Sequence, residues 1–267
     1  MGIDTERVGA VLTIRLNRPD VLNALDPVAM AELRDALVGF RDDDSLAVAI
    51  IAGEGERAFS AGADLSQTPA SDHPFAAGYY APLKQGMRNG AYVRALVFDD
   101  LHISKPLIAA INGHALGGGL EIALQCDLRI ASTTATFGLP EVRWATVPGA
   151  GGVSNLLRAV PRAVAMKLIL TGDRIDAHEA LRVGLVSDVV APDELMTTAL
   201  EIADRIAGNG PLAVRSVTSL AHRTQDLPLS QSVAIEQLMW GSLRDTADRA
   251  EGRDAFAERR APNYQGK

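Results

Sequence analysis

The chain has very little cysteine, no excess of basic residues and no long hydrophobic run. Cys126 is the only cysteine among 267 residues, which excludes an internal disulfide and is typical of a reducing compartment. The net charge of −7 leaves no basic surface for nonspecific nucleic-acid binding. No apolar run approaches the ~20 residues of a membrane span, and the first residues lack an apolar signal core. We therefore expect a cytoplasmic protein that binds neither nucleic acid nor membrane.

The usual signatures of metal and nucleotide sites are missing as well. The five histidines are scattered without ligand spacing, and no serine lies in a G-x-S-x-G elbow. The three glycines at 117–119 lack both the dinucleotide-binding spacing and the lysine of a P-loop. Cys126 lies in an apolar run, which predicts a small core residue rather than a nucleophile. We expect no metal and no cofactor.

What is present is an alternation of strands and helices. The run 11–16 alternates as a strand does, and 47–52, 107–111 and 128–131 are short apolar runs typical of buried strands. Asp26 and Pro27 predict the start of a helix that extends to about Phe40. This alternation predicts an α/β core of parallel βα units.

Two other parts of the chain follow different patterns. The segment 67–92 is polar and contains three tyrosines, and we read it as loop and short helices; it covers a site or is only a surface insertion. From residue 149 onward the pattern is mostly helical, with a strand at 187–190 and helices at 193–207, 212–222, 229–244 and 248–260. We expect a core at 1–195 and a helical C-terminal segment at 196–267 that supports oligomerisation.

The most informative motif is the triple glycine 117–119 ahead of the apolar helix 120–126. Glycine lets a ligand approach the backbone closely, and the first N–H groups of a helix have no partner within it. An oxyanion site is therefore favoured, although close packing of strand and helix is the alternative. A second glycine turn, 59–64, follows the buried strand 47–52, where α/β proteins bind ligands.

Two glutamates complete the pattern. Glu121 lies in an otherwise apolar helix, where a carboxylate is costly unless it is paired or functional. Burial raises a carboxyl pKa toward the range useful for acid–base catalysis. Stabilisation by the helix dipole is the alternative for Glu121, and an exposed loop acid is the alternative for Glu141, which follows Pro140.

Taken together, these motifs resemble the crotonase, or enoyl-CoA hydratase/isomerase, superfamily. The resemblance covers nearly the whole chain and is carried by the segments 17–19, 22–25, 58–64, 105–127, 137–141, 148–152, 170–172, 184–186 and 251–260. It implies a spiral of ββα units and a C-terminal helical segment used for assembly. It also implies a homotrimer or dimer of trimers that acts on an acyl-CoA thioester, with coenzyme A as part of the substrate and no cofactor.

The resemblance assigns roles to individual residues. It implies an oxyanion hole formed by the N–H groups of Ala63 and Gly118, and catalytic carboxyls at Glu121 and Glu141. The residues that it places near coenzyme A are Ala24, Ala61, Asp64 and Leu65, together with Trp240 and Arg259 from the C-terminal helices. The expected activity is that of a carbon–oxygen lyase, the reversible syn addition of water to a 2-trans-enoyl-CoA in fatty-acid or related acyl-CoA metabolism.

Other functions stay open at this point. Another reaction of the family is the main alternative, either enoyl-CoA isomerisation or dehydration of a specialised substrate such as carnitinyl-CoA. The presence of both glutamates favours water chemistry. A binding protein without catalysis on the same scaffold is a further alternative. The run 142–146, including Trp144, departs from the hydratase pattern, which leaves the acyl group undefined.

Overall fold

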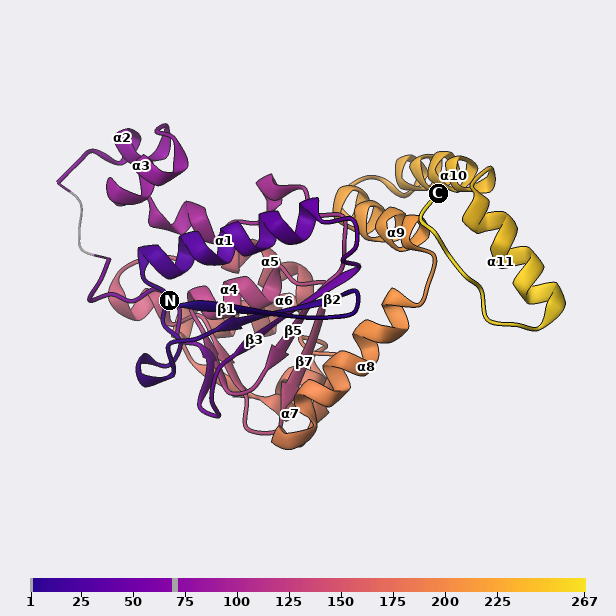
Figure 1. The fold of residues 1–267 in the computed structure, drawn as a ribbon. Helices are drawn as coiled ribbons and strands as arrows, with labels where there is room; N and C mark the ends of the chain where they lie inside the picture. Colours follow the sequence, from indigo (N-terminus) through magenta and orange to yellow (C-terminus); the bar gives the residue numbers. More distant parts are fainter. Residues whose placement is uncertain (1, 69–71) are drawn as a thin grey trace.

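Strands of two sheets form the centre of the molecule (Figure 1). The computed structural model describes residues 2–68 and 72–267. Within them, the larger sheet has the strand order β1-β2-β3-β5-β7-β10 and the smaller the order β4-β6-β8-β9. The strands are β1 (Ile3–Val8), β2 (Val11–Leu16), β3 (Val48–Gly53), β4 (Ala58–Ser60), β5 (Leu107–Ile111), β6 (His114–Leu116), β7 (Leu128–Ser132), β8 (Thr136–Gly138), β9 (Arg174–Asp176) and β10 (Asp188–Val190).

The chain crosses between the sheets in a repeated way. β3, β5 and β7 lie parallel in the larger sheet, and each is followed directly by β4, β6 or β8 of the smaller sheet. A helical segment then returns the chain to the larger sheet. This spiral of ββα units confirms the predicted fold class.

Helices surround the sheets. They are α1 (Pro27–Asp42), α2 (Phe75–Tyr79), α3 (Leu83–Arg88), α4 (Gly118–Leu124), α5 (Gly152–Ala159), α6 (Arg162–Thr171), α7 (Ala177–Arg182), α8 (Leu195–Ala207), α9 (Pro211–Thr224), α10 (Leu229–Arg244) and α11 (Ala247–Glu258). Short 3-10 turns are η1 (Pro19–Val21), η2 (Tyr92–Leu96), η3 (Asp99–Leu101), η4 (Pro140–Trp144) and η5 (Pro192–Glu194). None of the helices among residues 2–68 and 72–267 has both the length and the apolar character to cross a membrane.

Local sequence signals explain most of these elements. The Asp26 side chain accepts a hydrogen bond from the Ala29 N–H at 2.8 Å, as expected of an N-cap. The predicted apolar face of α1 is buried, and so are the strands β3 and β5 along their whole length. The predicted helices of the last third are all present. Of the segment 67–92, residues 69–71 lie outside the described residues, and the rest contains α2 and α3.

Some elements differ from the sequence prediction. The sequence did not predict β1, because five of its six residues are exposed and it shows no apolar alternation. It pairs antiparallel with β2 through a turn at Gly9, which has φ +58°. Glu141 was predicted in a loop but lies in η4, where Pro140 occupies the first position. Arg259 was placed inside the last helix but follows it, with φ +56°.

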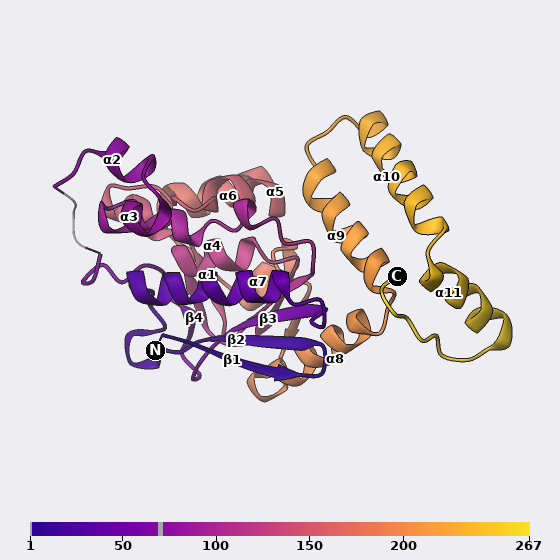
Figure 2. The ribbon, with the colours of Figure 1, turned by 45° about the horizontal axis from the view of Figure 1, so that its top comes forward.

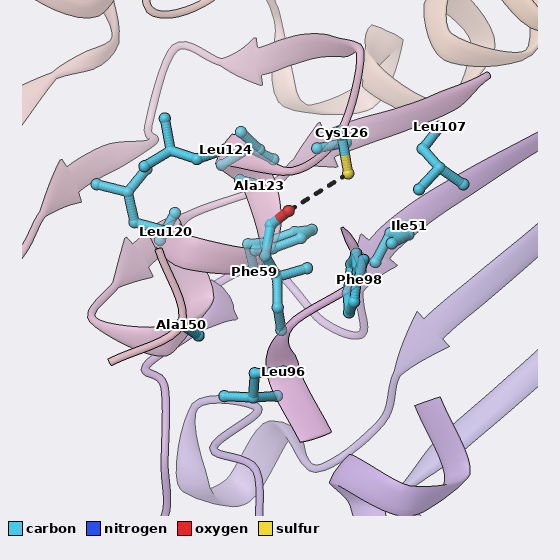
Figure 3. Packing of buried hydrophobic residues seen from close by; sticks show 14 of the residues in the cluster. Ile51, Phe59, Leu96, Phe98, Leu107, Leu120, Ala123, Leu124, Cys126 and Ala150 are labelled. Carbon is cyan, nitrogen blue, oxygen red and sulfur yellow. Dashed lines mark hydrogen bonds between the residues drawn. The ribbon is translucent and has the colours of Figure 1, made fainter. Parts of the chain in front are cut away.

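The core lies between the sheets and their helices (Figure 3). Cys126 is one of its residues, as predicted, with the sulfur directed at the backbone oxygen of Ile122 at 3.5 Å. Burial raises the pKa of the Cys126 thiol to about 12. The thiol therefore stays protonated and acts as a packing group.

The C-terminal helices divide into two kinds. α8 packs on the larger sheet through Leu195, Ala199 and Ala203, which are all buried. In contrast, α9, α10 and α11 extend away from the sheets beside α8, with α10 packed on α9 (Figures 1 and 2). The division after residue 195 stays a prediction; α9 is still joined to the core, through Arg215 with Asp44 at 2.9 Å and His222 with Asp127 at 2.6 Å.

Candidate active site

The triple glycine forms the tight connection between β6 and α4. Gly117 has φ +53°, and the helix begins at the next residue. A methyl group built on Gly119 would lie 2.2 Å from the Ser60 carbonyl oxygen, so close packing of strand and helix explains this glycine. A methyl group on Gly118 would instead lie 3.2 Å from the Leu96 side chain and 3.5 Å from the Ala63 nitrogen. Gly118 therefore lies next to the second glycine turn.

That second turn contains Ala61, Gly62 and Ala63. Gly62 has φ +89°, and a methyl group on it would lie only 2.7 Å from the Gly118 nitrogen. The Ala61 N–H donates to Leu22, and the Gly62 carbonyl accepts from Leu25. Within the described residues, the N–H groups of Ala63 and Gly118 have no acceptor. Two free N–H donors thus lie side by side, as the predicted oxyanion hole requires.

Glu121 lies one turn into α4 and is only 3% exposed. Its Oε1 accepts hydrogen bonds from the N–H groups of Ala150 at 2.7 Å and Gly152 at 2.9 Å. Burial raises the pKa of the carboxyl, and the two N–H donors oppose that rise by stabilising the anion. One oxygen is therefore fixed, and Oε2 is left for another partner.

Glu141 approaches the same glycine turn from η4. A methyl group built on Gly117 would lie 3.1 Å from its Oε1, and its buried Oε2 has no hydrogen-bond partner among the described residues. Burial and the nearby Glu121 raise the pKa of Glu141 to about 7. The site thus pairs a carboxyl held by two donors with one that gains and loses a proton near neutral pH. Such pairs are typical of acid–base chemistry.

Arg18 holds together the residues expected near coenzyme A. Its guanidinium donates to the Ala24 carbonyl at 2.6 Å and pairs with Asp64 at 3.0 Å and Asp26 at 3.3 Å. The turn that contains Ala61 and Asp64 is therefore fixed against the segment of Ala24, and Leu65 beside it is exposed. The Asn17-Arg18-Pro19 motif was noted in the sequence, but nothing there indicated that its arginine would join these two turns.

Two expected residues lie elsewhere. Trp240 is in α10 and Arg259 follows α11, and both are exposed. The helices that carry them lie away from α4 in both views (Figures 1 and 2). Within one chain, the structure does not bring these two residues to the glycine turns. His114 is hydrogen bonded to Thr136 between β6 and β8 at 2.8 Å, which agrees with a structural role.

Several contributors were missed by sequence reasoning. The N–H donors of Ala150 and Gly152 are backbone groups, and the only signal was the glycine-rich run 148–152. Leu96 of η2 contacts Gly118, and Val93 lies 3.3 Å from a methyl group built on Gly149. Both side chains thus lie against the glycines of the site, in a stretch with no recognisable motif.

Comparison with known proteins places this fold and site in a family. Residues 6–267 match the sequence profile of the enoyl-CoA hydratase/isomerase family. The (E)-benzylidenesuccinyl-CoA hydratase of Thauera aromatica is 45% identical, with 100% of both chains covered. The carnitinyl-CoA dehydratase of Proteus mirabilis is 40% identical over 97% of this chain and 96% of that protein. The structure of an enoyl-CoA hydratase from Bacillus anthracis matches with a TM-score of 0.89 and 36% identity over 100% of both chains.

The chain therefore belongs to the enoyl-CoA hydratase/isomerase family, as its sequence motifs indicated. Its relatives are named as hydratases and dehydratases of CoA thioesters. Hydration of an enoyl-CoA, a hydro-lyase reaction, is the activity that this membership supports.

Proposed function

We propose that Glu121 and Glu141 together add water across the double bond of a 2-enoyl-CoA whose thioester oxygen is held by Ala63 and Gly118. The observation that carries this assignment is the nearness of two carboxyls, the buried Glu121 and the half-buried Glu141, to two unpaired N–H groups. Hydration develops negative charge on the thioester oxygen, and the paired donors are placed to stabilise it.

The proton transfers follow from the two environments. Glu121 carries the carboxylate that is stabilised by Ala150 and Gly152, so its free oxygen takes a proton from water. The oxygen of that water bonds to Cβ while the π electrons move toward the thioester. Glu141, with a pKa of about 7, delivers a proton to Cα on the same face. Atoms and charge balance without a cofactor: Glu121 ends protonated and Glu141 ionised, and a proton passes from Glu121 back to Glu141 before the next turnover.

Binding of coenzyme A is assigned to the exposed edge of the second glycine turn. Ala24, Ala61, Asp64 and Leu65 are the core residues proposed for it, because Arg18 holds their segments together. Trp240 and Arg259 are proposed to reach coenzyme A only from another copy of the chain, since α10 and α11 extend away from the site.

A homotrimer or a dimer of trimers is the proposed assembly. Large apolar side chains are exposed on the helices that leave the core, among them Leu229, Leu238, Trp240 and Phe256. Such residues usually mark a contact surface. Native mass spectrometry measures the assembly directly, and a monomer at micromolar concentration would contradict the proposal.

A cytoplasmic location is also proposed, and it rests only on the single buried cysteine.

The names of the relatives suggest which acyl groups to test. A relative whose name includes a benzylidene group shares 45% identity over the full chain. We propose that the substrate is a 2-enoyl-CoA. The experiment covers both linear and aryl-substituted acyl groups. Purified protein is incubated with crotonyl-CoA, 2-decenoyl-CoA, cinnamoyl-CoA and (E)-benzylidenesuccinyl-CoA, and loss of the enoyl thioester absorbance is followed. No turnover of any of them would overturn the assignment. Dehydration of carnitinyl-CoA is the second candidate, because a relative at 40% identity carries that name.

A further inference from the structure

Arg94, in the middle of η2, joins that turn to the two short helices before it. Its Nη1 donates to the carbonyl oxygens of Gly78 at 2.9 Å and Ala81 at 2.8 Å. Its guanidinium carbon lies 5.9 Å from the centre of the Tyr79 ring. The cation thus lies at the C-terminal end of α2, bonded to the Gly78 carbonyl inside the helix and the Ala81 carbonyl just after it, where a positive charge is favoured.

The packing around this guanidinium is close. A methyl group built on Gly86 of α3 would lie 2.4 Å from the Gly78 carbonyl oxygen and 2.7 Å from Arg94 Nη1. The backbones of α2 and α3 therefore touch beside the arginine. The Ala91 N–H, just before η2, donates to the Gly86 carbonyl at 2.9 Å. α2, α3 and η2 form one packed unit, which we call the acyl-side cover (residues 75–96).

The other side of η2 contacts the active site. Leu96 lies against Gly118 of the oxyanion hole, and Val93 lies against Gly149, the neighbour of Ala150. The Gln125 side chain donates to the carbonyls of Leu96 at 2.8 Å and Glu121 at 3.0 Å. The position of η2 is therefore tied to the helix that carries Glu121, and the side chains of Val93 and Leu96 lie against the backbone of the proposed site.

We propose that Arg94 is a positioning residue that holds α2 and α3 against η2 and thereby determines which acyl groups the enzyme accepts. The inference rests on the proposed function. Arg94 contacts backbone carbonyls and Tyr79 rather than the reacting atoms. Loss of its bonds would loosen the wall that faces the acyl group, while the oxyanion hole and the carboxyls keep their own contacts. A short acyl group reaches little of that wall, whereas a long or aryl group depends on it.

The test compares Arg94→Ala with the wild type on crotonyl-CoA and on the bulkiest 2-enoyl-CoA that the wild type hydrates. We expect kcat/KM for the bulky substrate to fall about tenfold more than for crotonyl-CoA, chiefly through KM. The inhibition constant of free coenzyme A stays unchanged. Arg94→Lys restores most of the selectivity, because one nitrogen makes both hydrogen bonds in the native side chain. Arg88→Ala is the matched control, since it removes the same charge from an exposed position on α3.

The outcomes are separable. Equal losses on both substrates, or a selectivity within about twofold of the wild type, would show the inference wrong. If Arg94→Ala does not fold, the Lys and Met variants decide between the same outcomes. If the wild type hydrates no substrate, the proposed function fails. In that case calorimetric dissociation constants for crotonyl-CoA and 2-decenoyl-CoA, measured on wild type and Arg94→Ala, test the inference without turnover.

Discussion

One side of the proposed active site is formed by backbone groups and the other by side chains. On the thioester side, Gly62 and Gly119 bring backbone against backbone, with so little space that a methyl group on either would collide. On the acyl side, the wall consists of side chains from η2 and of short helices with exposed aromatic residues such as Phe75 and Tyr80. Backbone geometry holds one arrangement, whereas side chains change with each substitution. Under the proposed function, the backbone side therefore holds the reacting thioester and the side-chain side selects the acyl group.

The largest effect is expected from the acid itself. Glu141→Gln keeps the shape of the side chain but removes its proton transfer, which typically contributes ~10²–10⁴-fold to a rate. We expect kcat for hydration to fall by about that factor, while the affinity for coenzyme A measured by calorimetry stays nearly the same. Turnover at close to the wild-type rate would show that Glu141 has been given the wrong role.

The second-largest loss of activity is expected from Gly62→Ala, which affects the proposed oxyanion hole. The added methyl group would lie 2.7 Å from the Gly118 nitrogen and block that donor. Loss of one oxyanion donor costs ~10²–10³-fold in kcat, and steady-state kinetics with crotonyl-CoA measures it.

Gly9→Ala is the control for backbone strain. Gly9 also has a positive φ, +58°, but a methyl group there meets nothing within 4 Å. Both variants carry a left-handed alanine, which costs about 1–2 kcal/mol and lowers the melting temperature. Only Gly62→Ala is expected to lose activity, and equal losses in both variants would remove the argument for a blocked donor.

The pH dependence of hydration tests the difference between the two carboxyls. Glu141 has a raised pKa of about 7 and must hold a proton before water adds. We therefore expect kcat/KM to be highest below that pKa and to fall about tenfold per pH unit above it. The limb at lower pH belongs to Glu121, which must be ionised. In Glu141→Gln, we expect the decrease in kcat/KM near pH 7 to disappear from the residual activity. If that decrease remained, another group would be responsible for it.

The smallest effect is expected at Trp144, although it adjoins Glu141 in η4. Trp144 is 70% exposed, and substitutions at exposed positions typically change the free energy of unfolding by no more than ~0.5 kcal/mol. The fold around Glu141 is therefore expected to be kept. We expect Trp144→Ala to alter kcat/KM for crotonyl-CoA by less than about threefold. A large gain on bulky acyl-CoAs would show instead that Trp144 narrows the pocket.

Sequence patterns were sufficient for the parts that depend on side-chain character. The buried strands β3 and β5, the capped start of α1 and the two glutamates each left a distinct signal. The three-residue strands β4, β6, β8 and β9 did not, because so short a run shows no periodicity. The donors to Glu121 also could not be predicted, since every residue except proline carries a backbone N–H and only the fold decides where it points.

The segment 67–92, which contains most of the acyl-side cover, was predicted as loop and short helices that either cover a site or form a surface insertion. What could not be read from the sequence is that Arg94 reaches back to Gly78 and Ala81, because a contact across more than ten residues depends on how the helices pack. The structure explains why positions 78 and 86 are glycines, because the two backbones touch there and leave no room for a side chain on Gly86.

The position of the single sulfur has a consequence for an enzyme of this class. A 2-enoyl-CoA is both an acyl donor and an electrophile at Cβ, so an accessible thiolate would take over the acyl group or become alkylated. Cys126 is 3% exposed, and burial raises the pKa of its thiol to about 12, so the sulfur stays protonated and out of contact with the substrate. The burial of Cys126 therefore removes the thiol side reaction that would compete with water for the substrate.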